Sequence, residues 1–345
     1  MAKKRIDDGT IEFIKYHDAP TAIVISPTDI EIVKSFDRKW NITSHLIGNI
    51  EKLAQSRYEV ERLTDIKLDE WKYKADPTND PDKDKLRYKT LEYYIEPIAT
   101  SVYASAEIEG ESISISDMEI AIIGEPGKND YEHQAEYELR VQGVRSIYDA
   151  YLFALSRETP LEGGFIVKTD FIKELHKRMF EFTKPDIAGK FKETKNQIVR
   201  DNKAVVTALD PEFTEPYMDA ICKRISDKFA QADHYGAYSK LIAIAEFLLD
   251  FLAIHPFPDG NGRMARLLST YLLEKAKFYF ARFYSLDSII LEKRKSYYDS
   301  LYRSQMNWGT RDEDLTAWIQ FYIEAVYAQY SGAKLNLLNE NRKRK

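Results

Sequence analysis

Cysteine is nearly absent from this chain of 345 residues, which has only Cys222. A single cysteine excludes an internal disulfide framework and any metal site built from several thiolates. The sequence also lacks a run of about 20 apolar residues, the length that a membrane-spanning helix requires. Its first residues, MAKKRIDDGTIEF, contain no apolar segment typical of a signal peptide. We therefore expect a cytoplasmic protein without a membrane segment.

Glycine is scarce as well, at 14 residues, and most long segments carry apolar residues three or four positions apart. This spacing predicts amphipathic helices and an all-α core. Short connections between the helices favour a bundle. The predicted helices cover residues 94–109, 131–155, 170–181, 215–231, 238–253, 262–276, 293–305 and 315–330.

Two segments depart from the helical pattern. Residues 196–207, NQIVRDNKAVVT, hold two short β-favouring pieces around an Asp-Asn turn, which predicts one β-hairpin. Residues 75–85, ADPTNDPDKDK, are polar and contain proline, which is typical of a boundary. We therefore place a helical N-terminal region at residues 1–90, the main domain at 91–330 and a basic, solvated tail at 331–345.

The stretch IHPFPDGNGRMARLL, residues 254–268, combines proline, glycine and polar residues between apolar flanks. Pro256 and Pro258 prevent a helix from running through it, so a loop must form. Residues 259–262 tolerate the positive φ angles of a tight loop, and apolar residues at helical spacing resume after them. Such a loop directs free backbone N–H groups, and the positive end of the second helix, at one spot. The sequence therefore predicts an anion site.

Charged and titratable residues in this stretch suit a polyphosphate. Arg263 and Arg266 add forked donors on one helix face. Asp259 would repel phosphate unless a cation lay between them, and Mg²⁺ commonly bridges a carboxylate to substrate phosphates. His255 has an ordinary pKa that suits a general base near neutrality. The alternative is an ordinary helix–helix turn with a capping or core histidine, which would not need all of these residues together.

The stretch resembles the signature of the Fic family of nucleotidyl transferases, H-x-F-x-D/E-G-N-G-R-x-x-R. The resemblance extends over about residues 94–330 and implies an all-α Fic-fold helical bundle with one β-hairpin flap. It also implies transfer of AMP from Mg-ATP to a Ser, Thr or Tyr hydroxyl of a target protein, or of the chain itself. The signature is filled by His255, Phe257, Asp259, Gly260, Asn261, Gly262, Arg263 and Arg266.

The roles that the family implies fall on these residues one by one. His255 becomes the catalytic base, Asp259 the Mg²⁺ ligand and Phe257 the anchor of the loop in the core. Arg266 is expected to hold the γ-phosphate of ATP. The residues expected to hold the α- and β-phosphates are Gly260, Asn261, Gly262 and Arg263.

Two further segments resemble the family. AGKFKETKNQIV leads into the flap, whose strand would bind an extended target segment, with Ile198 and Val199 as docking residues. SYYDSL places Tyr298 on the adenine side of the nucleotide. One departure is Gln305, which stands where an asparagine often follows this tyrosine pair.

SAEIEG, residues 105–110, fits the S/T-x-x-x-E-G/N pattern of the inhibitory helix of autoinhibited Fic proteins. Ser105 and Glu109 share a helix face because they lie four residues apart. An ion pair between Glu109 and Arg266 would occupy the group meant for the γ-phosphate. The alternative is a helix that simply ends at Gly110 in a glycine cap.

Three alternative functions can be weighed on the same residues. Glu109 could instead orient a water that removes AMP, which would make the chain a de-AMPylase or an enzyme with both activities. Phosphotransfer is disfavoured by Gly262, because the toxin relatives that catalyse it carry lysine there. A noncatalytic nucleotide-binding regulator would not need His255. ATP and a target protein are the expected partners, a homodimer is compatible with the sequence, and the net charge of −6 disfavours nucleic acid.

Overall fold

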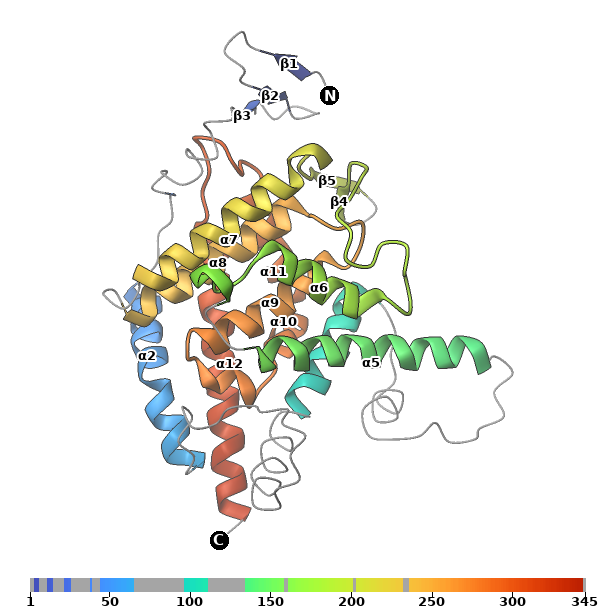
Figure 1. The fold of residues 1–345 in the computed structure, drawn as a ribbon. Helices are drawn as coiled ribbons and strands as arrows, with labels where there is room; N and C mark the ends of the chain where they lie inside the picture. Colours follow the sequence, from blue (N-terminus) through green and yellow to red (C-terminus); the bar gives the residue numbers. More distant parts are fainter. Residues whose placement is uncertain are drawn as a thin grey trace.

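The computed structural model describes residues 3–5, 11–14, 22–25, 38, 44–64, 96–110, 134–157, 161–200, 203–231 and 236–343. The described part is mainly helical, as the apolar spacing predicts (Figure 1). Its helices are α2 (Ser44–Thr64), an unlabelled helix at residues 96–109, α5 (Gln134–Ser156), α6 (Thr169–Phe180), α7 (Thr214–Gln231), α8 (Gly236–Ile254), α9 (Asn261–Lys275), α10 (Leu286–Glu292), α11 (Arg294–Gln305) and α12 (Thr316–Lys343).

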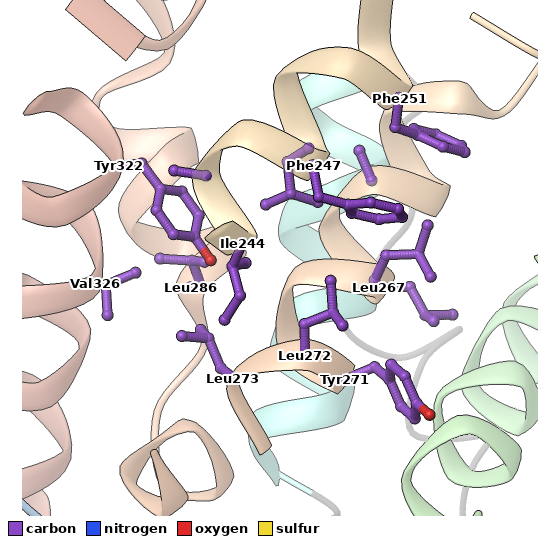
Figure 2. Packing of buried hydrophobic residues seen from close by; sticks show 14 of the residues in the cluster. Ile244, Phe247, Phe251, Leu267, Tyr271, Leu272, Leu273, Leu286, Tyr322 and Val326 are labelled. Atoms are coloured by element: carbon purple, nitrogen blue, oxygen red, sulfur yellow. The ribbon is translucent and has the colours of Figure 1, made fainter. Parts of the chain in front are cut away.

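The centre of the bundle is the pair α8 and α9, which the loop at residues 255–260 joins. α8 is apolar on nearly all sides, which suits a helix that is covered by others all round. Figure 2 shows its side chains Ile244 and Phe247 in one cluster with Leu272 of α9 and Tyr322 of α12. α2 runs beside α12, and α6 packs on α5 (Figure 1). The loop between α8 and α9 is therefore held on a closely packed core.

One buried carboxylate ties the N-terminal region to this core. Asp250 of α8 is 2% exposed and accepts two hydrogen bonds of 2.8 Å from the guanidinium of Arg38. Trp308 donates a third, also of 2.8 Å, and Arg224 forms an ion pair with the same carboxylate. Arg38 also contacts Glu313. A buried carboxylate is costly unless it is paired, and here both oxygens have partners.

Most helix ends lie within a few residues of the predicted ends. α10 and the 3₁₀ turns at Glu162–Gly164, Pro211–Phe213 and Tyr279–Arg282 were not predicted. α12 continues to Lys343, so the tail expected at residues 331–345 is mostly helical, and its residues Ala333 and Leu337 are buried. Among the described helices, none is both long enough and apolar enough to span a membrane.

The strands form two small antiparallel sheets. The first sheet pairs β1 (Lys3–Arg5), β2 (Ile11–Ile14) and β3 (Ala22–Ile25) in that order. The N-terminal region therefore contains strands, whereas we expected it to be helical. β4 (Gln197–Arg200) and β5 (Lys203–Thr207) pair with a register shift between Ile198 and Val199. The Asp-Asn turn between them lies outside the described residues.

Candidate functional site

The loop that follows α8 has two residues with positive φ. His255 has a φ of 51°, and Gly260, which begins α9 as its N-cap residue, has a φ of 77°. A Cβ atom on Gly260 would lie 2.3 Å from the ring of Phe180, so this position has no room for a side chain. Phe257 between them is fully buried and stacks on His176 with the ring centroids 3.8 Å apart. The loop is thus anchored in the core by its phenylalanine.

Asn261 fixes the shape of the loop. Its side-chain oxygen accepts from the backbone N–H of Phe257 at 2.9 Å, and its side-chain nitrogen donates to the Phe257 carbonyl at 2.8 Å. Asn261 is 1% exposed. The side chain of Asn261 is therefore engaged inside the loop. Only its backbone N–H is left for the phosphate-binding role that the sequence predicts.

His176 is a second residue that holds the loop in place. The backbone N–H of Gly189 donates to His176 Nδ1 at 3.0 Å, so the ring proton must lie on Nε2. Nε2 lies 3.1 Å from the carbonyl oxygen of Asp259 and donates to it. Burial lowers the pKa of His176 to about 4, so the ring is neutral at pH 7. His176 therefore joins α6, the segment before β4 and the loop.

His255 presents a free ring nitrogen. Its Nδ1 lies 3.3 Å from the carbonyl oxygen of Leu252, which can only accept, so Nδ1 carries the proton and Nε2 keeps its lone pair. Burial, with the charge of Lys192, lowers the pKa of His255 to about 4, and the hydrogen bond to Leu252 and the carboxylates of Glu109 and Asp259 oppose this. At pH 7 this imidazole is therefore neutral and able to accept a proton.

Arg266 lies one turn into α9 and meets residues 96–109. Its Nη2 atom lies 2.7 Å from Glu109 Oε1, and its Nε atom donates to the Ser105 hydroxyl at 2.8 Å. The Arg266 side chain is 2% exposed, whereas that of Glu109 is 32% exposed. Burial acts to lower the pKa of Arg266, but Glu109, Tyr297 and Asp287 outweigh it and raise the pKa. The guanidinium thus stays charged in the core.

The Glu109 carboxylate also lies directly against the start of α9. A Cβ atom on Gly262 would come within 2.2 Å of Glu109 Oε1. Gly110 follows with a φ of 82°, so the helix ends in the glycine cap that the sequence allowed as an alternative. The capped helix end also carries Glu109 to Arg266, so the glycine cap and the ion pair occur together.

Asp287 is a second carboxylate beside Arg266 that the sequence reasoning missed. Its Oδ1 atom lies 3.1 Å from Arg266 Nε, and the side chain is buried. Burial raises the pKa of Asp287 to about 6, while the charge of Arg266 and the hydroxyl of Ser101 act in the opposite direction. Ser101 also donates to the hydroxyl of Ser285 at 2.8 Å. Residues 96–109 therefore dock on α9 and on the start of α10.

Asp259 projects from the loop with its carboxylate partly exposed. One oxygen accepts from the backbone N–H of Gly260 at 2.6 Å and lies 3.6 Å from Arg263, while the other is bound by Lys184. Burial acts to raise the pKa of Asp259, but the hydrogen bond from Lys184 and the charge of Arg263 outweigh it and leave the pKa below its usual value. The carboxylate is ionised at neutral pH.

The structure brings most of the predicted site residues to one place. His255, Asp259, Arg263 and Arg266 lie along the loop and the first turns of α9, and Ser105 and Glu109 meet them from residues 96–109. Tyr298 of α11 is nearby, since burial and the charge of Glu109 raise its pKa. Ile198 and Val199 lie on β4, which begins next to Asn196, whose side chain donates to the Phe257 carbonyl at 2.7 Å.

Part of this chain matches a known protein family. Residues 166–273 match the model of the Fic/DOC family. This part of the chain is a Fic domain. The matched part of the Fic domain runs from α6 through the β4–β5 hairpin to α9 and contains the whole loop, whereas residues 96–109 lie outside it.

Relatives and solved structures agree with the Fic domain assignment. The chain is 29% identical over 226 residues to Protein adenylyltransferase Fic of Nematostella vectensis, covering 64% of this chain and 45% of that protein. It is 27% identical over 240 residues to Protein adenylyltransferase fic-1 of Caenorhabditis elegans, covering 67% and 41%. It therefore spans less than half the length of these curated relatives. A Fic family protein from Desulfovibrio desulfuricans G20 superposes with a TM-score of 0.62 at 20% identity, over 87% of this chain and 77% of that one, which shows a shared fold.

Proposed function

We propose that the chain transfers AMP from ATP to a Ser, Thr or Tyr hydroxyl of a target protein, and to itself. The observation that carries this proposal is the free Nε2 of a neutral His255, held in a loop that also begins α9 and brings Arg263 and Arg266 to the same place. Backbone N–H groups at a helix N-terminus bind phosphate, and a neutral imidazole accepts a hydroxyl proton. Relatives named protein adenylyltransferase support the same reaction class.

The proposed reaction uses the site residues as follows. His255 Nε2 takes the proton of the target hydroxyl as the hydroxyl oxygen bonds to the α-phosphorus of ATP. The bond from the α-phosphorus to its bridging oxygen breaks, and pyrophosphate leaves. The α- and β-phosphates are held by the backbone N–H groups of Gly260, Asn261 and Gly262 and by Arg263. The γ-phosphate is held by Arg266.

Asp259 is the residue proposed to hold Mg²⁺. The described residues contain no group of three or more metal-binding side chains, but Mg²⁺ needs only one or two carboxylates when phosphates and waters fill its other positions. Asp259 fits this requirement, because it is ionised, 42% exposed and next to the start of α9. The ion would neutralise charge on the phosphates. Lys184 must give up its contact with Asp259 for a cation to bind there.

We further propose that Glu109 inhibits the transfer. Its carboxylate lies 2.7 Å from Arg266 Nη2, the proposed γ-phosphate ligand, and against Gly262, one of the proposed ligands of the α- and β-phosphates. A carboxylate at this point repels the phosphate and engages its arginine. ATP would then bind poorly or in an unproductive pose. Tyr298, near Glu109, is proposed to line the adenine side.

The β4–β5 hairpin is proposed to bind the target. A strand with free backbone groups can pair with an extended segment of almost any sequence. Ile198→Pro removes a backbone N–H from β4, so modification of a target should fall more than self-modification, as measured by label incorporation into each. Equal losses in the two assays would count against docking on this strand.

The test of the proposed function is incubation of Mg-ATP with the Glu109→Gly chain and with the unaltered chain, using α-labelled and, separately, γ-labelled nucleotide. Adenylyl transfer puts the α-label and not the γ-label on protein. Label from γ alone would mean phosphotransfer and would refute the proposal. Nucleotide binding without transfer of either label would mean that the chain is a noncatalytic nucleotide-binding regulator.

A second candidate, removal of AMP from a modified protein, is favoured by the partial exposure of Glu109 beside the proposed phosphate site. A carboxylate there could orient a water for attack on the phosphorus of the protein-bound AMP, whose bond to the protein oxygen breaks and leaves the hydroxyl free. The unaltered chain should then release AMP from an AMPylated protein, and Glu109→Gly should abolish that release while allowing transfer. An enzyme with both activities would give both results.

A further inference from the structure

Lys192, between α6 and β4, contacts the backbone on both sides of His255. Its ammonium group donates to the carbonyl of Ile254 at 2.6 Å, and its backbone N–H donates to the carbonyl of Pro256 at 2.8 Å. The two acceptors are the residues immediately before and after His255. A single residue from another part of the chain therefore fastens the peptide groups that orient this imidazole.

The backbone of His255 needs such support. A φ of 51° is unusual for a residue with a side chain and persists only where surrounding contacts enforce it. The hydrogen bond from Asn196 to Phe257 adds a third tie between the same two segments. Without these ties, the peptide units around His255 could rotate toward ordinary φ values, and Nε2 would turn away from its present direction.

The cost of burying Lys192 also points to a specific role. Its side chain is 3% exposed, and an ammonium group is expensive to bury unless it is well paired. The Ile254 carbonyl lies at the C-terminal end of α8, where the helix dipole favours a positive charge. Burial lowers the pKa of Lys192 to about 7, with Asp210 acting against burial and Lys195 with it. A core position that needed only packing would be filled more cheaply by an apolar side chain.

We propose that Lys192 is a positioning residue for the base. By holding the carbonyl of Ile254 with its ammonium group, it keeps His255 in the left-handed conformation that aims Nε2 at the target hydroxyl. This inference rests on the proposed adenylyl transfer. Because Lys192 acts through His255, its loss should lower kcat while the affinity for ATP, which the start of α9 determines, stays nearly the same.

The test compares Lys192→Met, which keeps the length of the side chain and removes the donor and the charge, with Lys192→Arg, which keeps both. All variants carry Glu109→Gly so that transfer is measurable. Lys190→Met is the matched control, since Lys190 lies two residues away and is exposed. Rates of label transfer give kcat and KM, calorimetry gives ATP affinity, and NMR of the histidine ring reports the state of His255.

We expect Lys192→Met to lower kcat about tenfold or more, with ATP affinity within about twofold of the parent. Lys192→Arg should recover most of the rate, and Lys190→Met should match the parent. Loss of the neighbouring positive charge should also raise the pKa of His255, so the acid limb of the rate profile moves to higher pH. That limb depends on the remaining charges around His255, which are Glu109 and Asp259 in the unaltered chain.

An unchanged kcat in Lys192→Met would overturn the inference, as would a fall in ATP affinity as large as the fall in kcat. Failure of Lys192→Arg to recover any rate while it binds ATP normally would also overturn it. Absence of transfer in the Glu109→Gly parent would refute the proposed function instead. In that case the NMR comparison still decides the inference, because the His255 signals must move in Lys192→Met and not in Lys190→Met.

Discussion

The loop that carries His255, together with the start of α9, is held differently on its two sides. On its core side, the contacts come from Lys192, His176 and Asn261, which are 3%, 0% and 1% exposed. On its open side, the contacts come from Glu109 and Lys184, whose side chains are 32% and 46% exposed. Buried contacts of this kind are costly to break, whereas partly exposed ion pairs exchange at little cost. The core side thus sets the shape of the site, and the open side is where a ligand can replace the chain's own groups.

The two groups on the open side match two parts of Mg-ATP in charge, because Glu109 is negative like the phosphates and Lys184 is positive like Mg²⁺. The Glu109 carboxylate lies where the γ-phosphate contacts are proposed, and the Lys184 ammonium lies on the carboxylate proposed for Mg²⁺. Each therefore satisfies a charge of the site that a ligand would otherwise satisfy. Changes on the core side should affect the chemistry, and changes on the open side should affect ligand binding and control.

The largest effect should come from His255→Ala, which removes the group that the core side positions. Adenylyl transfer should fall by about 10²- to 10⁴-fold, because proton removal from the hydroxyl is lost. ATP affinity should stay nearly the same, because the proposed phosphate contacts lie on α9. Transfer of α-label and calorimetry in the Glu109→Gly background measure both quantities. A loss of affinity as steep as the loss of rate would show that His255 is structural.

On the open side, Glu109→Gly should raise self-modification by roughly 10- to 100-fold, since it removes one hydrogen bond to a charged, buried group. Arg266→Ala added to this variant should erase the gain, because both changes act through one pair. Glu107→Gly, the same substitution two residues earlier in the helix, is the control for helix weakening. Equal activation by both glycine variants would mean that loosening of the helix, and not the ion pair, is responsible.

Acid should weaken the core side, and the effect can be assigned to His255. Its pKa is about 4 in the folded chain and ordinarily 6.5, so between these values the unfolded chain binds a proton that the folded chain does not. The free energy of unfolding therefore falls as pH falls, by about 1.4 kcal/mol per pH unit for this group.

Urea unfolding at pH 6 and pH 5 should show a shallower fall for His255→Ala than for the unaltered chain, by about that amount. The difference isolates His255, because His176 contributes in the same direction in both proteins and Asp287, with its raised pKa, contributes in the opposite direction in both. Parallel pH dependences would mean that His255 is not held neutral by the fold.

The smallest effect should come from Lys184→Met. Loss of a partly exposed ion pair should raise the affinity for a divalent cation in the presence of ATP by about two- to fivefold. Titration with Mn²⁺ followed by electron paramagnetic resonance measures this without relying on catalysis. Added salt should shrink the difference, and Lys190→Met should show none. A fall in cation affinity would mean that Lys184 supports the metal site instead of competing with it.

Local features of the sequence predicted much of this site. Proline, glycine and apolar spacing place the loop between two helices, and the four-residue separation of Ser105 and Glu109 puts both on the face that meets Arg266. The residues that hold the loop on its core side were not predictable in the same way. His176 and Lys192 act on residues more than 60 positions away, and nothing in their local spacing distinguishes them from packing or surface residues.

The end of α12 shows a different limit. The sequence predicts a helix at residues 315–330 and a basic, solvated tail after it. In the structure Gly332 lies within the helix, and a Cβ atom there would come within 2.8 Å of the Tyr284 ring. The glycine makes room for an aromatic side chain from another segment. Glycine occurs both where distant segments approach closely and where a helix ends, so only the packing shows which of the two applies.

The absence of a side chain at Gly262 has a consequence for how such a protein can evolve. The glycine leaves backbone open for the proposed phosphate contacts and also gives the Glu109 carboxylate the surface on which it lies, 2.2 Å from where a Cβ atom would be. Any substitution there would disturb the proposed inhibition by Glu109 and the proposed phosphate site in the same step. A lineage that placed a longer residue at this position would lose this form of control even with Glu109 intact, and would need a separate inhibitor. Selection on the proposed reaction would thereby preserve the proposed inhibition without acting on it directly.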